Sequence, residues 1–316
     1  MKLSQLRNLV AVAEAGTIRQ AARNLFLSQS SVTKSLQELE AYLGVELLHR
    51  TAHGVAPTAA GAALIARAKV VEAELRQARN DIETVRGAGS GEIRVSASPS
   101  VAVGLLPRAV LAFKRGHPKV TFQIQEGVYP DVLPAVRMGE LDFAICLVPE
   151  RPRDEELHFE LLLRDDLTPA VRTGHPLAGR GRLSFDELVA SDLEWVIYRR
   201  GPGGRDVYEQ TFRAAGLAPP KGTIECTSFA CALALVEASD CITLLPSRLF
   251  ADRQRRMSIT PLALASPMPP WNVAVISRAK HRLAPVCTEF LRELHRTAAK
   301  MQAPPAKAGA ARRTPG

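Results

Sequence analysis

Hydrogen-bonding side chains are concentrated in residues 28–33 of the 316-residue chain, where the sequence reads "SQSSVT". An amphipathic helical pattern follows, with Val32, Leu36, Leu39 and Leu43 on one face. Short polar side chains are poor in helix interiors but favourable as helix caps. The stretch therefore either caps an ordinary surface helix or offers donors and acceptors to a partner outside the fold, and the edges of DNA base pairs are such a partner.

Three short helices would position this stretch. The segment "LSQLRNLVAVAEAG" stops at Gly16, Thr17 can cap "IRQAARNLF", and Ser28 can cap a third helix that stops at Gly44. Two helices joined by about three residues, the second opening with polar groups, form a helix-turn-helix whose second helix enters the major groove. The pattern predicts DNA binding.

The expected DNA contacts come from polar and basic side chains of this region. Lys34 would contact a phosphate or a guanine, and a hairpin-like segment around Gly54 would place Arg50 and His53 over the backbone or minor groove as a wing. The net charge of +9 permits a polyanionic partner without proving one. The predicted DNA-binding residues are Thr17, Arg19, Gln29, Ser30, Ser31, Thr33, Lys34, Arg50 and His53.

Residues 58–87 form one long helical pattern with a regular apolar seam. Its members, separated alternately by four and three positions, are Leu64, Ala68, Val71, Leu75, Ala78, Ile82 and Val85. Such a heptad stripe either packs on its own domain or pairs with a partner helix, and the flexible "GAGSGE" joint beside it favours a homodimer. Two paired reading heads would recognise double-stranded DNA with an interrupted inverted repeat.

From residue 92 to about residue 296, strand-like runs alternate with helical ones, which predicts an α/β section. Expected helices begin after residues 98–100, 127–130 and 227–228, and helix N-termini at strand ends suit an anionic small molecule. Ser98 and Ser100 have the alternative role of capping or loop hydrogen bonding. The Gly-rich "YRRGPGGRD" lacks the G-K-[ST] ending of a phosphate-binding loop and has the alternative of a surface turn.

Several classes of protein are disfavoured. The chain has no G-x-S-x-G, no H-E-x-x-H and no close His/Asp/Ser set, so we expect no enzyme, cofactor or metal. The five cysteines include no C-x-x-C pair, which favours buried, reduced thiols and leaves a redox-sensing thiol as the alternative. Without a bilayer-spanning apolar run or signal sequence, we predict a cytoplasmic protein that does not bind membranes.

Residues 1–90 resemble the N-terminal half of a LysR-type transcriptional regulator. The resemblance is carried by "LRNLVAVAEAGTIRQAARNLFLSQSSVTKSLQELEAYLGVELLHRT" and "PTAAGAAL", and the α/β section fits the effector domain of that family. It therefore covers nearly the whole chain. The sequence departs from the family at Ser30, where many members have Pro, and at Thr33 and Lys34, where Ser and Arg are common.

The resemblance implies an α/β fold with an N-terminal winged helix-turn-helix, a long coiled-coil linker helix and a two-lobed effector domain like a periplasmic binding protein. The implied divisions are a DNA-binding domain (1–57), a linker (58–87), a hinge (88–92), lobe I (93–163 and 268–297), lobe II (164–267) and a disordered tail (298–316). Crossovers would fall near residues 163–166 and 262–267. The implied effector-binding residues are Ser98, Pro99, Ser100, Val128, Tyr129, Arg200, Gly201, Pro202, Gly203, Thr227, Ser228 and Phe229.

The function that the resemblance implies is ligand-responsive regulation of transcription. The stretches around the cleft look most like those of regulators that answer aromatic sulfonates or carboxylates. Binding would shift the populations of lobe arrangements within a homotetramer and so change promoter bending, with RNA polymerase as a further partner. A regulator that responds to redox conditions through a cysteine thiol is the alternative.

Overall fold

The structure is a computed structural model, and it describes residues 1–51, 54–86, 90–198, 204–220, 223–250, 258–268 and 270–302. The N-terminal domain consists of α1 (Leu3–Ala15), α2 (Ile18–Asn24), α3 (Gln29–Leu43) and the hairpin of β1 (Leu48–Thr51) and β2 (Gly54–Pro57). The predicted helix ends are confirmed. Thr17 and Ser28 cap α2 and α3, and Gly16 and Gly44 close α1 and α3 in the left-handed conformation.

The core of this domain forms where the apolar faces of the three helices meet. Leu9, Val12, Val32, Leu36 and Leu39 are fully or almost fully buried in one cluster. Apolar packing on the inner face of the helix-turn-helix thus stabilises it and leaves the polar first turn of α3 facing outward.

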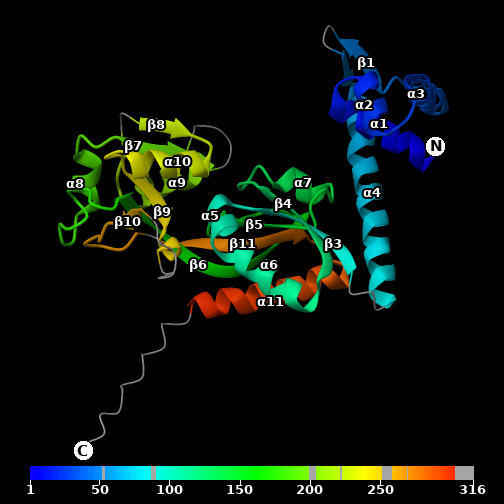
Figure 1. Cartoon of the computed structure of the whole chain (residues 1–316). Helices are drawn as coiled ribbons and strands as arrows, with labels where there is room; N and C mark the ends of the chain where they lie inside the picture. The colour runs from blue at the N-terminus through cyan, green and yellow to red at the C-terminus, as the bar shows by residue number, and fades with distance from the viewer. Residues whose placement is uncertain are drawn as a thin grey trace, which may run out of the picture.

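A single long helix, α4 (Ala59–Val85), connects this head to the α/β part of the molecule and lies along its side (Figure 1). The predicted hinge at residues 88–92 is shorter than expected, because Ser90, Gly91 and Glu92 already belong to β3. The Asn80 side chain of α4 fixes this strand start: its Nδ2 donates to the Glu92 carbonyl at 3.0 Å, and its Oδ1 accepts from the Glu92 amide at 3.1 Å.

The first lobe of the α/β part is built on parallel and antiparallel strands with helices against them. Its elements are β3 (Ser90–Ala97), α5 (Pro99–Val103), α6 (Leu105–Gly116), β4 (Lys119–Glu126), α7 (Leu133–Arg137), β5 (Phe143–Val148), β11 (Pro270–Arg278) and α11 (Pro285–Gln302). The rings of Phe113, Phe122, Phe143 and Phe290 pack together at its centre. The prediction of a disordered tail is wrong for residues 298–302, which belong to α11, where Ala298 is buried; residues 303–316 lie outside the described residues.

The second lobe contains α8 (Phe185–Ala190), β7 (Trp195–Tyr198), α9 (Gly204–Ala214), β8 (Thr223–Cys226), α10 (Phe229–Ala238), β9 (Thr243–Pro246), the short η1 (Ser247–Leu249) and β10 (Ile259–Pro261). One 16-residue strand, β6 (Leu157–Arg172), runs through both lobes. It pairs with β11 as far as Asp166, and with β9 from Leu167 onward. The seven-stranded sheet has the order β10-β6-β11-β5-β3-β4, with β9 also on β6.

Candidate DNA-binding face and effector cleft

The outer surface of α3 carries most of the predicted DNA-reading side chains. Gln29, Ser30, Ser31 and Lys34 are exposed, whereas Thr33 is half-buried and its hydroxyl donates to the Gln29 carbonyl at 2.9 Å. The hydroxyls of Ser30 and Ser31 contact the capping hydroxyl of Ser28 at 3.0 and 2.7 Å. Capping and exposure therefore coexist here: Gln29 and Lys34 are exposed, and among the described hydrogen bonds their side chains make none to the capping hydroxyl of Ser28.

The remaining predicted DNA-binding residues belong to α2, with its cap, and to the β1–β2 hairpin. Arg19 is exposed on α2, while the Thr17 hydroxyl accepts a hydrogen bond from the Gln20 amide at 3.2 Å as a helix cap. The backbone of Arg50 lies in β1, opposite Val55 of β2, which is the hairpin expected of a wing. The Arg50 side chain and His53 lie outside the described residues.

One residue of this surface was missed by the sequence reasoning. Phe26, in the turn between α2 and α3, is 96% exposed and has a φ of 56°. The left-handed region is unfavourable for a residue other than Gly, Asn or Asp, so this turn holds an aromatic ring in solvent at a conformational cost. An apolar residue in a turn gives no sequence signal that it will be left unburied.

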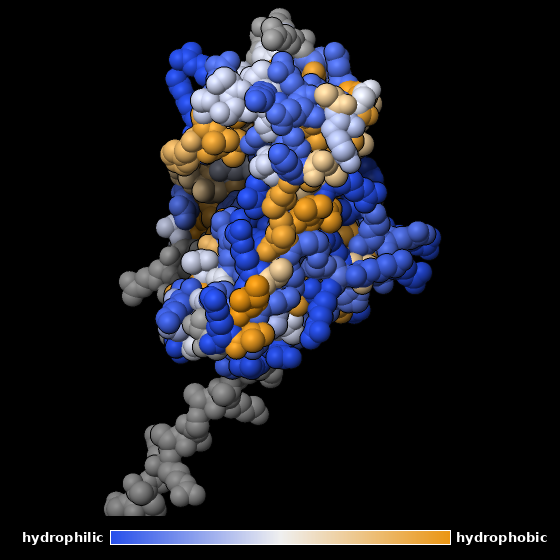
Figure 2. All heavy atoms as spheres, turned by 90° about the vertical axis from the view of Figure 1, so that its right-hand side faces the viewer, coloured by the Kyte–Doolittle hydropathy of each residue, from blue (hydrophilic) through white to orange (hydrophobic). Residues whose placement is uncertain are grey.

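The predicted seam of α4 divides into two parts. Leu64 and Ala68 pack on Leu6 and Val10 of α1 in the same chain, and Ala68 is only 1% exposed. Beyond them the rest of the seam is exposed, from Val71 and Leu75 through Ala78 to Ile82 and Val85. Figure 2 shows hydrophobic residues running down the side of the molecule on which α4 lies. Packing on its own domain is therefore confirmed for the first stretch of the seam, whereas pairing with a partner helix stays a prediction for the exposed stretch.

The opposite face of α4 is fastened to lobe I. Arg76 donates to the Gly139 carbonyl at 2.6 Å, and Glu74 pairs with Arg278 at 3.0 Å. Nearer the head, the Lys69 ammonium lies 2.9 Å from Glu14 of α1 and 2.5 Å from Glu140, which precedes β5. Burial lowers the pKa of Lys69, but the two carboxylates outweigh burial and raise it.

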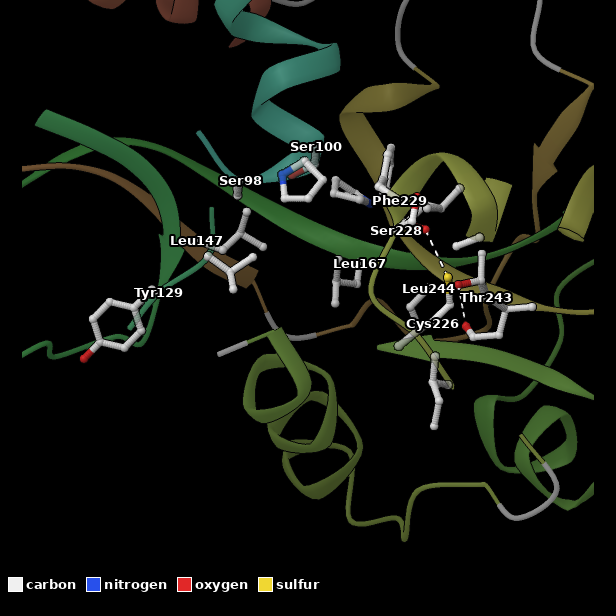
Figure 3. Close-up of a pocket in the computed structure, with 17 residues that line it drawn as sticks. Ser98, Ser100, Tyr129, Leu147, Leu167, Cys226, Ser228, Phe229, Thr243 and Leu244 are labelled. Atoms are coloured by element: carbon white, nitrogen blue, oxygen red, sulfur yellow. Dashed lines mark hydrogen bonds between the residues drawn. The ribbon is translucent and has the colours of Figure 1, made fainter. Parts of the chain in front are cut away.

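A cavity of about 150 Å³ lies between the two lobes. Figure 3 shows Ser98 and Ser100 on one side of it, Cys226, Ser228 and Phe229 on the other, and Leu147 and Leu167 between them. The described lining residues are Ser98, Pro99, Ser100, Val128, Tyr129, Leu147, Leu167, Val196, Ile197, Cys226, Ser228, Phe229, Ala232, Thr243, Leu244, Leu245 and Pro246. They include no charged side chain, so the described walls are apolar with a few hydroxyl groups.

The structure therefore brings together seven of the predicted effector-binding residues, namely Ser98, Pro99, Ser100, Val128, Tyr129, Ser228 and Phe229. Thr227 does not belong to the described lining; it is exposed, because Cys226 faces the cavity and the next side chain of an extended segment points the other way. Arg200, Gly201, Pro202 and Gly203 lie outside the described residues. Sequence reasoning missed the apolar walls, whose strand residues look like ordinary core.

Two polar features stand out in this apolar cavity. The Ser98 hydroxyl is buried and has no hydrogen-bond partner among the described residues. Across the cavity, Ser228 caps α10, its hydroxyl accepting from the Cys231 amide at 3.2 Å. An unpaired buried hydroxyl is costly unless a ligand or water satisfies it.

A winged helix-turn-helix joined by a long helix to a two-lobed α/β domain with an interlobe cavity defines a DNA-binding regulator with a ligand-binding domain. Residues 3–62 match the bacterial regulatory helix-turn-helix proteins of the lysR family, and residues 86–299 match the LysR substrate binding domain. The chain belongs to the LysR family of transcriptional regulators.

The similarity to known relatives extends over most of the chain. It is 30% identical over 250 residues to the regulator GbpR of Azospirillum brasilense, covering 79% of this chain and 72% of GbpR. It is 31% identical over 285 residues to the SDS degradation transcriptional activation protein of a Pseudomonas species, covering 90% and 92%. The crystal structure of the LysR family regulator CbnR superposes with a TM-score of 0.69 at 25% identity, covering 94% of this chain and 99% of CbnR.

A structure of full-length CbnR with its target DNA is similar as well, with a TM-score of 0.68, 26% identity and coverage of 94% and 100%. Among the described residues, none of the helices is long and apolar enough to cross a membrane, and no group of three or more His, Cys, Asp or Glu side chains is placed to hold a metal ion.

Proposed function

We propose that the protein is a cytoplasmic, non-enzymatic regulator that senses a small amphiphilic acid, in the first place an aromatic sulfonate or carboxylate, in the interlobe cavity. The observation that carries the proposal is the unpartnered buried hydroxyl of Ser98 in an otherwise apolar cavity. Apolar walls accept a hydrocarbon ring, while Ser98 and Ser100 donate hydrogen bonds to an oxyanion.

The size of the cavity supports a single-ring effector. In another protein, an engineered cavity of about 150 Å³ holds one benzene molecule. The described cavity is of the same size, at about 150 Å³. One relative is named for the degradation of SDS, which also combines an apolar body with one oxyanion group, so alkyl sulfates form the natural competing class.

The DNA-bound form that we propose is an oligomer. The exposed part of the α4 seam supports pairing through this helix, and paired heads would bind an interrupted inverted repeat. Effector binding would favour one lobe arrangement, and a tetramer of such subunits would convert that preference into a change in promoter bending and in the contact with RNA polymerase.

A thermal-shift panel on the full-length protein tests the effector class. It compares benzoate and benzenesulfonate with the neutral benzamide and with a short alkyl sulfate, in the wild type and in Ser98→Ala. We expect the aromatic acids to raise the Tm of the wild type and to lose most of that effect in the variant. Equal shifts from benzamide and benzoate would contradict recognition of the oxyanion, and shifts only from the alkyl sulfate would replace the ring with a chain.

A further inference from the structure

The two accessible cysteines of the described chain lie on either side of one turn, and the first of them lines the cavity. Cys226 is half-buried and lines the cavity, and Cys231 is exposed. The other three thiols, Cys146, Cys241 and Cys287, are buried. Burial raises the pKa of Cys146 to about 12, which leaves it without a reactive thiolate. Accessibility thus selects one pair of sulfur atoms out of five.

The turn from β8 into α10 holds this pair together through Ser228. The Cys226 thiol donates to the Ser228 carbonyl at 3.2 Å (Figure 3). The Cys231 amide donates to the Ser228 hydroxyl, also at 3.2 Å. One residue thereby fixes both the end of the strand and the first turn of the helix. The two thiols also contact each other, and their hydrogen bond raises the pKa of Cys231.

We propose that Cys226 and Cys231 form a reversible intramolecular disulfide, so that the rim of the cavity is an oxidation site. A hydroperoxide is the oxidant that we assign. The thiolate of one cysteine attacks the O–O bond, giving a sulfenic acid and releasing an alcohol or water. The second thiol then attacks that sulfur, the S–S bond forms, and water leaves. In total, two thiols and one hydroperoxide give one disulfide, one alcohol and one water.

The bond would change the cavity as well as the sulfur atoms. Cys226 would give up its hydrogen bond to the Ser228 carbonyl, and the turn that carries Ser228 and Phe229, both lining residues, would be closed into a short ring. Short rings restrict few conformations of the unfolded chain, so the bond would contribute little stability and would remain reducible. Its formation needs neither an effector nor DNA, and it is therefore independent of the function proposed above.

Peptide mapping of the full-length protein tests the pair directly. Chymotrypsin cleaves after Phe229, between the two cysteines, giving fragments 218–229 and 230–233, while Cys241 lies in a separate fragment. After treatment with hydrogen peroxide and blocking of free thiols, we expect the two fragments to remain joined until a reductant is added. The intact protein should lose the mass of two hydrogen atoms and two of its five alkylatable thiols.

Three variants make the test selective. Cys226→Ser and Cys231→Ser should each abolish the linked fragments, and the variant that keeps the attacking cysteine should leave a sulfenic acid that dimedone traps. Cys241→Ser should behave as the wild type. Stoichiometric binding of phenylarsine oxide to the reduced wild type, which requires two adjacent thiols, checks the geometry without any substitution. Separate fragments after oxidation, a bond to Cys241, or absence of arsenical binding would overturn the proposal.

Discussion

At the scale of single residues, Phe26 shows a side chain kept in an unfavourable place. It is 96% exposed at a φ of 56°, one turn before the polar surface of α3. Strain of this kind costs about 1–3 kcal/mol and persists where a function requires it. Apolar contact with a thymine methyl group or a deoxyribose is a function that an exposed ring can perform beside a recognition helix.

We therefore expect Phe26→Asn to weaken DNA binding and at the same time to stabilise the fold. Asn tolerates the left-handed conformation, so the free energy of unfolding should rise by about 1 kcal/mol, while the contact of the ring with DNA is lost. Calorimetry and DNA titration measure the two effects separately. Tyr42→Asn, which removes a 69% exposed aromatic ring from the last part of α3, is the control and should leave the DNA affinity unchanged. Parallel losses in stability and affinity would indicate a structural role for Phe26.

Asp165, on the strand that links the lobes, is a second residue whose environment matters more than its type. Burial raises its pKa to about 6, although Arg248 lies 3.8 Å away and the Asp166 amide donates to its carboxylate at 3.0 Å. Because the folded-state pKa is above the unfolded value of about 3.9, the folded state binds the proton more tightly. Stability from this group is complete below about pH 4 and is lost as the pH rises through about 6.

The Asp165→Asn variant should accordingly become more stable relative to the wild type as the pH increases. Asn stays neutral, so the difference in the free energy of unfolding should move in favour of the variant by about 1–3 kcal/mol between about pH 4 and pH 8. Urea unfolding at several pH values measures it. Asp166→Asn, with Asp166 bonded to the Ser247 hydroxyl at 2.8 Å, serves as the neighbouring control. A difference that is constant with pH would contradict the buried titration of Asp165.

Some features of single residues could be predicted from residue type alone. The caps at Thr17 and Ser28 follow from local chemistry, because a hydroxyl just before a helix can accept a hydrogen bond from its first amides. The cavity position of Ser98 was predicted from its place at the end of a strand, since its side chain makes no capping hydrogen bond. The exposure of Phe26 and the burial of Asp165 depend on what the rest of the chain leaves uncovered or packs against them. Neither can be inferred from neighbouring residues in the sequence.

At the scale of elements, α4 shows how one periodic pattern serves two surfaces. The seven-residue repeat predicted an apolar stripe correctly. The sequence does not show, however, at which residue the stripe stops packing against the DNA-binding head. Only the packing of Ala68 against Leu6 and Val10 shows that the first part is internal. The exposed remainder, from Val71 to Val85, is a contiguous apolar surface of a kind that soluble proteins usually cover.

If two chains pair through this surface, as we propose, Ile82→Glu should separate them without unfolding either one. Ile82 is 54% exposed, so an acidic side chain costs little in the monomer, whereas two of them facing each other across a helix pair repel. Sedimentation velocity should show the shift to monomer, with an unchanged far-UV circular dichroism spectrum. Leu161→Glu, at a 49% exposed position on β6, is the control and should remain associated. An Ile82→Glu protein that stays fully associated would place the interface elsewhere.

At the scale of the whole molecule, one ammonium group of the linker helix contacts both the DNA-binding head and the effector domain. Lys69, with its side chain only 17% exposed, lies between Glu14 of the DNA-binding domain and Glu140 of lobe I. This junction could not be predicted from the sequence, since the three residues are far apart along the chain and each alone looks like a surface charge. Ion pairs that are half-buried and hydrogen-bonded are screened less by salt than exposed ones.

This junction offers a direct path by which movement of lobe I reaches the DNA-binding head, so Lys69→Gln should loosen the docking of the two. We expect amide hydrogen exchange to rise both at the C-terminal end of α1 and in residues 138–142. These two segments carry Glu14 and Glu140, the carboxylates that pair with Lys69. Arg86→Gln, which breaks a pair with Glu83 within α4 itself, is the control and should leave both segments protected.

A charge exchange separates coupling from a general loss of stability. If the Lys69–Glu140 pair holds lobe I to the linker, Lys69→Glu combined with Glu140→Lys should recover protection near residue 140 that either single change removes. Protection at α1 should not recover, because Glu14 would then face another carboxylate. Recovery of protection at one segment without the other is a pattern that only a three-way junction produces. Additive losses of protection in the double variant would show that the two carboxylates act independently of Lys69.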